Sequence, residues 1–134
     1  MPTNLELFRM IINRGFNEGD LSVADDVCSP ALVEHEYLAN THLPGPAILK
    51  GQIEAARAAN PDLSLSIEDM VEDRDKVWAR LRARGTDPRT GKSVSFDVID
   101  ICRFEDGKLV EHWGVPDRFA LLHQIGALPP PDSN

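Results

Sequence analysis

The sequence has no surplus of basic residues. Across its 134 residues, 14 Lys and Arg stand against 22 Asp and Glu, which gives a formal net charge of −8. Proteins that bind nucleic acid neutralise its phosphates with Lys and Arg, and attachment to anionic membranes depends on the same residues. The acidic balance therefore argues against nucleic acid and membrane surfaces as partners.

Long apolar runs are also missing. No stretch approaches the roughly 18 residues of a membrane span, and the first segment, MPTNLELFRMII, lacks the basic start and apolar core of a signal peptide. The two cysteines, Cys28 and Cys102, lie far apart and outside a C-x-x-C spacing, so we expect both to be small apolar core residues. This cysteine usage predicts a cytoplasmic protein with reduced thiols.

The sequence lacks the common signatures of metal and nucleotide sites. It contains no phosphate-cradling glycine loop and no G-x-S-x-G nucleophile elbow. His35 and His42 do not have the i, i+4 spacing on a helix that a metal-binding pair uses, and no compact His/Asp cluster accompanies them. We therefore expect no metal site.

The residues that are present define an order of elements. Helical periodicity comes first and predicts helices over residues 4–15, 20–29 and 47–60, whereas the segment 31–46 is not clearly helix or strand. Alternation follows and predicts strands over 63–71, 77–86, 94–104 and 109–115, with a closing helix over 117–128. This order predicts one α+β domain over residues 1–134, with helices packed on one face of a curved antiparallel sheet that encloses a pocket.

The stretch richest in ionisable groups is LVEHWGVPD, residues 109–117. Strand side chains alternate faces, so Trp113 and Asp117 share one side and His112 takes the other if the strand runs unbroken. Pro116 lacks a backbone donor and marks a strand end or a bulge, which leaves the side of Asp117 open by one step. We expect Trp113 and Asp117 to face the cavity, and His112 to have a structural or interface role on the opposite face.

Three segments of the chain resemble one family. They are NPDLSLSIEDMVEDRDKVWARLRARGT, GKSVSFDVIDICRFEDGKLVEHWGVPD and LLHQIGAL, and through them nearly the whole chain is similar to the SnoaL-like polyketide cyclases, also called ester cyclases. The resemblance implies the cone-shaped α+β fold of the nuclear transport factor 2 (NTF2)-like superfamily. It also implies a cofactor-free enzyme that closes a ring by intramolecular aldol condensation. Its general acid/base is an aspartate after the last strand's tryptophan, and the pattern Trp113-x-x-x-Asp117 assigns that role to Asp117.

Asp117 has two opposed interpretations. A position beside an indole in an apolar pocket would suit a carboxyl group that gives and takes protons near neutral pH. Capping of the closing helix would instead hold the carboxyl group ionised on free backbone N–H groups. Both interpretations stay open from the sequence.

Several further residues are candidates for contact with a substrate. His35 and Tyr37 lie in a region where many relatives have a pocket-lining histidine, and the Tyr37 hydroxyl could orient a substrate carbonyl. Asn40 and His42 lie on a loop that could cover the mouth of the cavity, and Phe96 adds an apolar group from the third strand. A structural hydrogen bond or a surface position is the alternative for the polar members of this set.

Other polar residues have plainer interpretations. Glu111 is expected to form an ion pair with an arginine of a neighbouring strand. Trp78 shares one stripe with Arg80, Arg82 and Arg84, which predicts a polar outer face or a dimer surface, unless one arginine reaches an anionic group of a substrate.

The leading hypothesis is an enzyme that acts on a hydrophobic, enolisable small molecule by cyclisation or by a related isomerase or dehydratase step. A non-catalytic small-molecule binder and an interaction domain are the alternatives outside catalysis. Epoxide hydrolysis, with Asp100 and Arg82 beside Asp117, is the main alternative chemistry. Because many relatives are dimers, we expect a homodimer.

Overall fold

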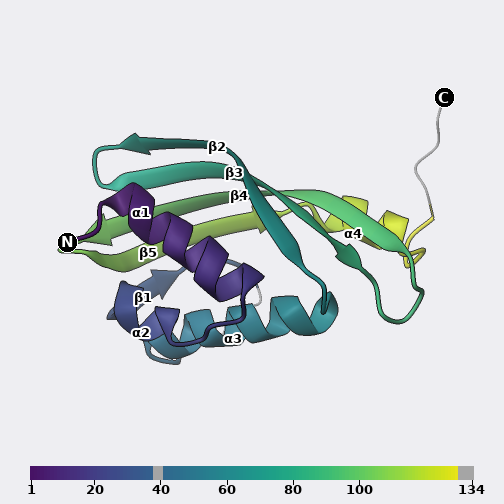
Figure 1. Cartoon of the computed structure of the whole chain (residues 1–134), viewed down its shortest axis with the longest axis horizontal. Helices are drawn as coiled ribbons and strands as arrows, with labels where there is room; N and C mark the ends of the chain where they lie inside the picture. Colours follow the sequence, from purple (N-terminus) through teal and green to yellow (C-terminus); the bar gives the residue numbers. More distant parts are fainter. Residues whose placement is uncertain (38–40, 130–134) are drawn as a thin grey trace.

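The computed structural model describes residues 1–37 and 41–129 (Figure 1). Its elements follow the expected order of helices before hairpins, with one strand inserted among the helices. In chain order they are α1 (Asn4–Met10), the π-helix η1 (Ile11–Asn17), α2 (Val23–Val27), β1 (Cys28–Glu34), α3 (Gly45–Ala59), β2 (Ser64–Asp73), β3 (Lys76–Thr86), β4 (Ser93–Glu105), β5 (Lys108–Pro116) and α4 (Arg118–Gln124). None of the described helices has the length and apolar composition that a membrane span needs.

The five strands form one open sheet in the order β1-β5-β4-β3-β2. Strands β2 to β5 pair antiparallel, as their alternation predicts, whereas β1 joins β5 in parallel. The α+β fold with helices on one face of a curved sheet is confirmed (Figure 1). The sheet is nevertheless mixed rather than purely antiparallel, because residues 28–34 form a strand, whereas their sequence predicts a helix end followed by a segment without clear periodicity. This strand contains Pro30, which is tolerated because β1 lies at the edge of the sheet.

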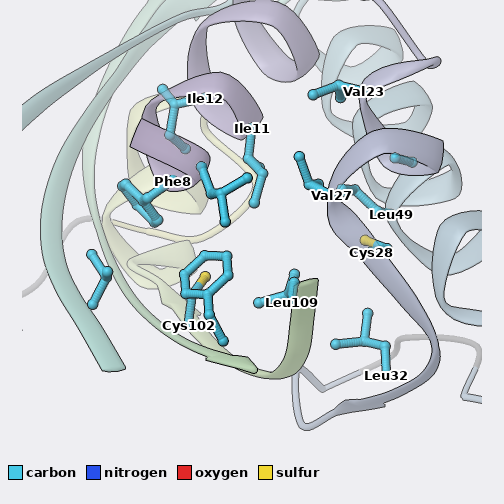
Figure 2. Packing of buried hydrophobic residues seen from close by; sticks show 14 of the residues in the cluster. Phe8, Ile11, Ile12, Val23, Val27, Cys28, Leu32, Leu49, Cys102 and Leu109 are labelled. Carbon is cyan, nitrogen blue, oxygen red and sulfur yellow. The ribbon is translucent and has the colours of Figure 1, made fainter. Parts of the chain in front are cut away.

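The hydrophobic core lies between the helices and the sheet (Figure 2). Phe8 and Ile12 from the first two helices and Ile53 from α3 are almost completely buried in it. Full burial of side chains of this size contributes about 1.5–3 kcal/mol each. Cys28 and Cys102 are both buried in the same cluster and both free, which confirms their prediction as core residues.

The hairpin between β4 and β5 contains the irregularity that decides what faces the pocket. Asp106 and Gly107 form the two-residue turn with positive φ values of 50° and 75°, as the EDGK sequence predicts. Phe104 then pairs with Leu109, but Arg103 pairs with Glu111, so one extra residue of β5 stands in a bulge. Because of this extra residue, each side chain of β5 beyond the bulge points to the face opposite the one that simple alternation, counted from the turn, would give it.

Candidate active site

A pocket of about 560 Å³ lies between α3, the first helices and the sheet face that they cover. Most of its wall is apolar, because the side chains that these elements point inward are the same apolar side chains that build the core. Representative wall residues are Phe8, Ile12, Leu32, Leu81, Phe96, Val98 and Leu121. Such a wall suits the hydrophobic part of a small molecule.

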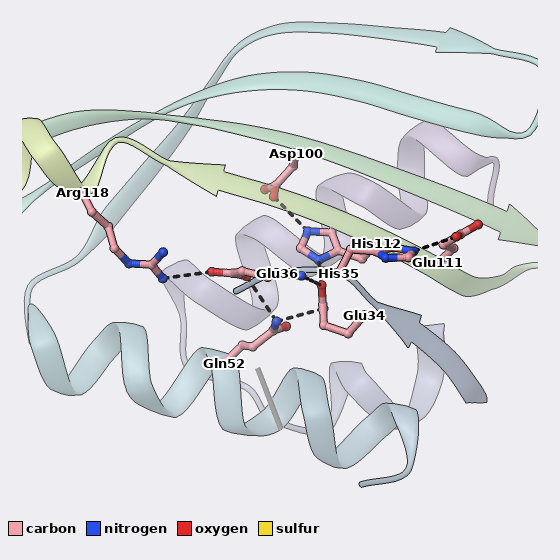
Figure 3. Close-up of polar contacts among 8 residues, drawn as sticks. All are labelled: Glu34, His35, Glu36, Gln52, Asp100, Glu111, His112 and Arg118. Carbon is pink, nitrogen blue, oxygen red and sulfur yellow. Dashed lines mark hydrogen bonds and ion pairs between the residues drawn. The ribbon is translucent and has the colours of Figure 1, made fainter. Parts of the chain in front are cut away.

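One end of the pocket is polar and is built by five elements or their ends (Figure 3). Carboxylates come from Glu34 at the end of β1, from Glu36 just after it, and from Asp100 of β4. His112 of β5 lies among them, and Gln52 of α3 and Arg118 of α4 complete the group. A charged group in apolar surroundings is costly unless it has a partner. The contacts among these side chains therefore determine which of them are charged and which can exchange a proton.

His112 is held between two carboxylates. Its Nδ1 lies 2.7 Å from Oε2 of Glu34, and its Nε2 lies 2.9 Å from Oδ1 of Asp100. Burial alone would lower the pKa of His112, but the hydrogen bonds and charges of Asp100 and Glu34 outweigh it and raise the pKa to about 10. His112 is therefore an imidazolium at neutral pH, and both of its N–H groups already donate to protein carboxylates.

Glu34 is the fixed anion of the group. Its side chain is 1% exposed, and besides His112 it accepts hydrogen bonds from the Gln52 side chain at 2.9 Å and from the backbone N–H of Glu36 at 3.0 Å. Burial would raise the pKa of Glu34, but the contacts with His112 outweigh that effect and the pKa is lowered. Glu34 thus stays ionised and serves as a scaffold.

Glu36 has the opposite environment. Burial raises the pKa of Glu36, with added repulsion from Glu34 and Asp100 that the nearby cations His112 and Arg118 reduce. Its two side-chain contacts are both long, at 3.3 Å from Gln52 Nε2 and 3.3 Å from Arg118 Nη2. A loosely held carboxyl group with a raised pKa is a stronger proton acceptor than an ordinary glutamate.

Gly114 makes room for the Asp100–His112 contact. It pairs with Asp100 across the β4–β5 ladder. A Cβ at Gly114 would lie 2.9 Å from Oδ1 of Asp100 and 2.9 Å from Cε1 of His112, closer than a real Cβ approaches. The missing side chain therefore lets the Asp100 carboxylate lie against the imidazolium.

Asp117 lies outside this group. It is exposed, stands at the N-cap of α4, and accepts a hydrogen bond from the backbone N–H of Ala120 at 3.0 Å. The described residues that line the pocket do not include it. Asp117 thus has the helix-capping position, and it does not lie in the apolar pocket as we expected.

Of the other residues predicted to contact a substrate, some line the pocket and some lie outside it. Tyr37 and Phe96 line the pocket, as expected. His35 and Trp113 instead stack on each other outside it, with ring centroids 4.8 Å apart, and His35 Nε2 lies 2.8 Å from a Glu111 oxygen. Asn40 falls outside the described residues.

The outward position of Trp113 has a physical cause. His112 and Gly114 do lie on the face opposite Trp113, as alternation predicts, but it is their face that lines the pocket. Because of the bulge, Leu109 and His112 both face the pocket, although strict alternation would put them on opposite sides. The expectation that His112 lies on the face away from the cavity is therefore wrong.

Arginines of the strands form ion pairs with neighbouring acidic residues. Glu111 forms the expected ion pair, with Oε1 2.9 Å from Nε of Arg103 on the neighbouring strand. The Asp-Arg-Asp arrangement for epoxide opening is not formed, because Arg82 pairs with Asp97 at 3.2 Å, whereas Asp100 lines the pocket. Trp78 is 44% exposed, in agreement with an outer-face position for its stripe.

Ligand atoms of Glu34, Glu36 and His112 lie within 4.8 Å of one another, a spacing that a metal ion could bridge. A metal-bound histidine must be neutral and must offer one nitrogen to the ion. Here both ring nitrogens face carboxylates and the pKa of His112 is about 10. The group therefore fits an imidazolium better than a metal ion.

Comparisons with known proteins agree with this architecture. A family model described as SnoaL-like polyketide cyclase matches residues 6–125. TsrD from Streptomyces laurentii is 28% identical with a TM-score of 0.81, covering 92% of this chain and 95% of its own. IdmH from Streptomyces antibioticus, a candidate polyketide cyclase, is 27% identical with a TM-score of 0.78 and coverage of 91% and 97%. AclR from Streptomyces galilaeus, a candidate hydroxylase, is 28% identical with a TM-score of 0.78 and coverage of 95% and 83%. No curated protein sequence matches the chain.

Proposed function

Because the chain belongs to the SnoaL-like polyketide cyclase family, we propose that it is an enzyme that transfers protons at an enolisable carbon of a hydrophobic, polyketide-type small molecule, without a cofactor. The observation that supports this proposal is Glu36, a carboxyl group with a raised pKa at the polar end of an apolar pocket. Asp117, the residue to which the resemblance assigns this role, is a helix cap in solvent. We therefore assign the general acid/base role to Glu36.

The proposed reaction uses Glu36 and Arg118 together. Ionised Glu36 takes the proton from the carbon beside a substrate carbonyl, and the electron pair of that C–H bond moves onto the carbonyl oxygen to give an enolate. Arg118, whose Nη2 lies 3.3 Å from Glu36, is released by the neutralised carboxyl group and can stabilise the enolate oxygen. The enolate carbon then attacks a second carbonyl of the same molecule, and the new alkoxide takes the proton back from Glu36.

The remaining polar residues position these two. The imidazolium of His112 fixes Glu34, and Glu34 accepts the backbone N–H of Glu36. Asp117 positions Arg118 indirectly, because it caps α4 and Arg118 is the first residue of that helix. The pocket wall supplies the rest of the rate by holding the two ends of one substrate close together.

The Glu36 assignment can be tested by hydrogen–deuterium exchange. Exchange of the α-protons of 2-tetralone and a panel of β-keto esters in D₂O, followed by NMR, measures the first step without requiring the natural substrate. Glu36→Gln should lower the catalysed exchange by about 10²- to 10⁴-fold, the usual contribution of a general base. Asp117→Asn is the matched control and should keep it within a few-fold, because its cap is retained by an amide oxygen.

Equal exchange by wild type and Glu36→Gln would remove the assignment of the base. A loss confined to Asp117→Asn would return the role to that residue. If the wild type binds the ketones but exchanges no protons, the second candidate function, a non-catalytic binder that uses the same pocket, is the better one.

We also propose that the chain pairs with a second copy through the outer face of the sheet. Val71, Trp78, Ile99 and Val115 are exposed large hydrophobic residues on β2 to β5. The same strands carry Arg80 and Arg82 with their partners Asp69 and Asp97, so a two-fold axis could set opposite charges against each other. The cytoplasmic location stays a prediction.

The pairing surface predicts a specific effect on oligomeric state. Trp78→Glu places a charge in the middle of the apolar patch and should shift a dimer to monomer in light scattering coupled to size-exclusion chromatography. Leu43→Glu, a similar change at an exposed residue that lines the pocket, should leave the mass unchanged. A wild-type protein that elutes as a monomer at high concentration would contradict the proposal.

A further inference from the structure

Gly51 lies in the middle of α3, the helix that forms one wall of the pocket. Glycine is among the least favourable residues for a helix interior, second only to proline. In proteins such a residue usually has a compensating reason, which is either an unusual backbone angle or a close approach of other atoms.

Neither structural reason applies to Gly51. The glycines with left-handed backbone angles are Gly19, Gly91, Gly107 and Gly126, so Gly51 is not among them. A Cβ at Gly51 would meet no described atom within 4 Å, whereas a Cβ at Gly114 would meet two atoms at 2.9 Å. Gly51 is itself exposed, and within the described residues its missing side chain leaves open space and serves no packing contact.

That open space borders the pocket as well as solvent. Gly51 lines the pocket, together with Ala47 and Ala55 one helical turn before and after it. Its neighbour Gln52 also lines the pocket and donates to both Glu34 and Glu36. The space at Gly51 and the amide of Gln52 therefore border the same pocket, although neighbouring helix positions point in different directions.

We infer that Gly51 is a specificity-determining residue, which keeps α3 bare so that the apolar body of the substrate can lie against the helix while its reacting carbon approaches Glu36. The location of the reacting carbon rests on the proposed function, but the space at Gly51 does not. The space at Gly51 favours substrates that carry a large apolar group next to the enolisable carbon. Filling the space should exclude such molecules and leave the fold intact.

The test compares Gly51→Ala and Gly51→Leu with Ala58→Leu, a matched control on the same helix at an exposed residue that does not line the pocket. The probe is N-phenyl-1-naphthylamine, a neutral apolar dye whose fluorescence rises on binding. Gly51→Leu should weaken dye binding by about tenfold or more, as an overfilled site does, and Ala58→Leu should not. Gly51→Ala should raise the melting temperature by a few degrees, because alanine is the better helix residue.

Three results would overturn the inference. The first is dye binding by Gly51→Leu equal to that of the wild type, and the second is a wild type that does not bind the dye at all. The third is a Gly51→Ala variant that melts below the wild type, which would show a structural need for glycine. Dye binding requires no proton transfer, so a failure of the proton-transfer proposal and a failure of this one give different results.

Discussion

Replacing His112 with alanine is expected to lower the free energy of unfolding by about 3–5 kcal/mol, the usual penalty for removing one partner of a buried ion pair. The imidazolium donates to Glu34 at 2.7 Å and to Asp100 at 2.9 Å, and the side chains of Glu34, His112 and Asp100 are 1%, 13% and 14% exposed. Without it, two carboxylates would remain in an apolar enclosure with no cation between them. Taking up protons would relieve the repulsion, but at the expense of the hydrogen bonds that order the polar end.

Urea denaturation followed by circular dichroism measures this loss. His35→Ala is the matched control, because His35 also pairs with a glutamate at 2.8 Å, but at an exposed position where ion pairs contribute little. If His112→Ala does not fold, the combination of His112→Leu, Glu34→Leu and Asp100→Leu should, because replacing a whole buried ionic group by apolar residues is often neutral. Equal stability of the two single histidine variants would contradict the buried-cation interpretation.

The second large effect is a loss of stability in mildly alkaline solution. The pKa of His112 is about 10 in the folded chain against 6.5 for an ordinary histidine. The extra stability from its charge is fully present below pH 6.5 and is lost as the pH rises toward 10. Each pH unit well inside that window removes about 1.4 kcal/mol, so stability should fall by about 2 kcal/mol between pH 6.5 and 8.5.

The chosen window separates His112 from other groups. Glu34, which faces it, has a lowered pKa and carries its charge throughout this range. Burial raises the pKa of Cys28 to about 12 and that of Cys102 well above 9, so ionisation of these thiols in the unfolded chain adds to the loss only above about pH 9. Urea titrations at several pH values should show the slope in the wild type, and His112→Gln should abolish it. A flat profile in the wild type would show that the histidine is not charged in the fold.

Much of the fold could be predicted from the sequence because its elements are locally specified. Alternation in β2 to β5 and the Asp106-Gly107 turn lead directly to the antiparallel meander that the structure contains. The strand β1 could not be found in this way, because it is short and buries only some of its residues, and its partner β5 is far away in the chain. Parallel pairing of this kind depends on tertiary contacts and leaves little local pattern.

The site was harder to predict for the same reason. Glu34 and Glu36 belong to the segment that showed no clear periodicity, so their convergence on the pocket had no local signal. His112 was recognised, but the sequence does not indicate that an extra residue in β5 turns it toward the helices. Phe96, on a strand without such an irregularity, was placed correctly in the pocket wall.

The bulge in β5 has a consequence for how this pocket can change over time. The extra residue is what lets Leu109 and His112 face the same side, and loss of its codon would leave Glu111 opposite Arg103 and His112 still turned toward the pocket. An insertion of one residue between Glu111 and His112 would instead turn the following side chains over, with Trp113 toward the pocket and His112 away from it. One inserted residue would thus replace the ionic end of the cavity by an aromatic one.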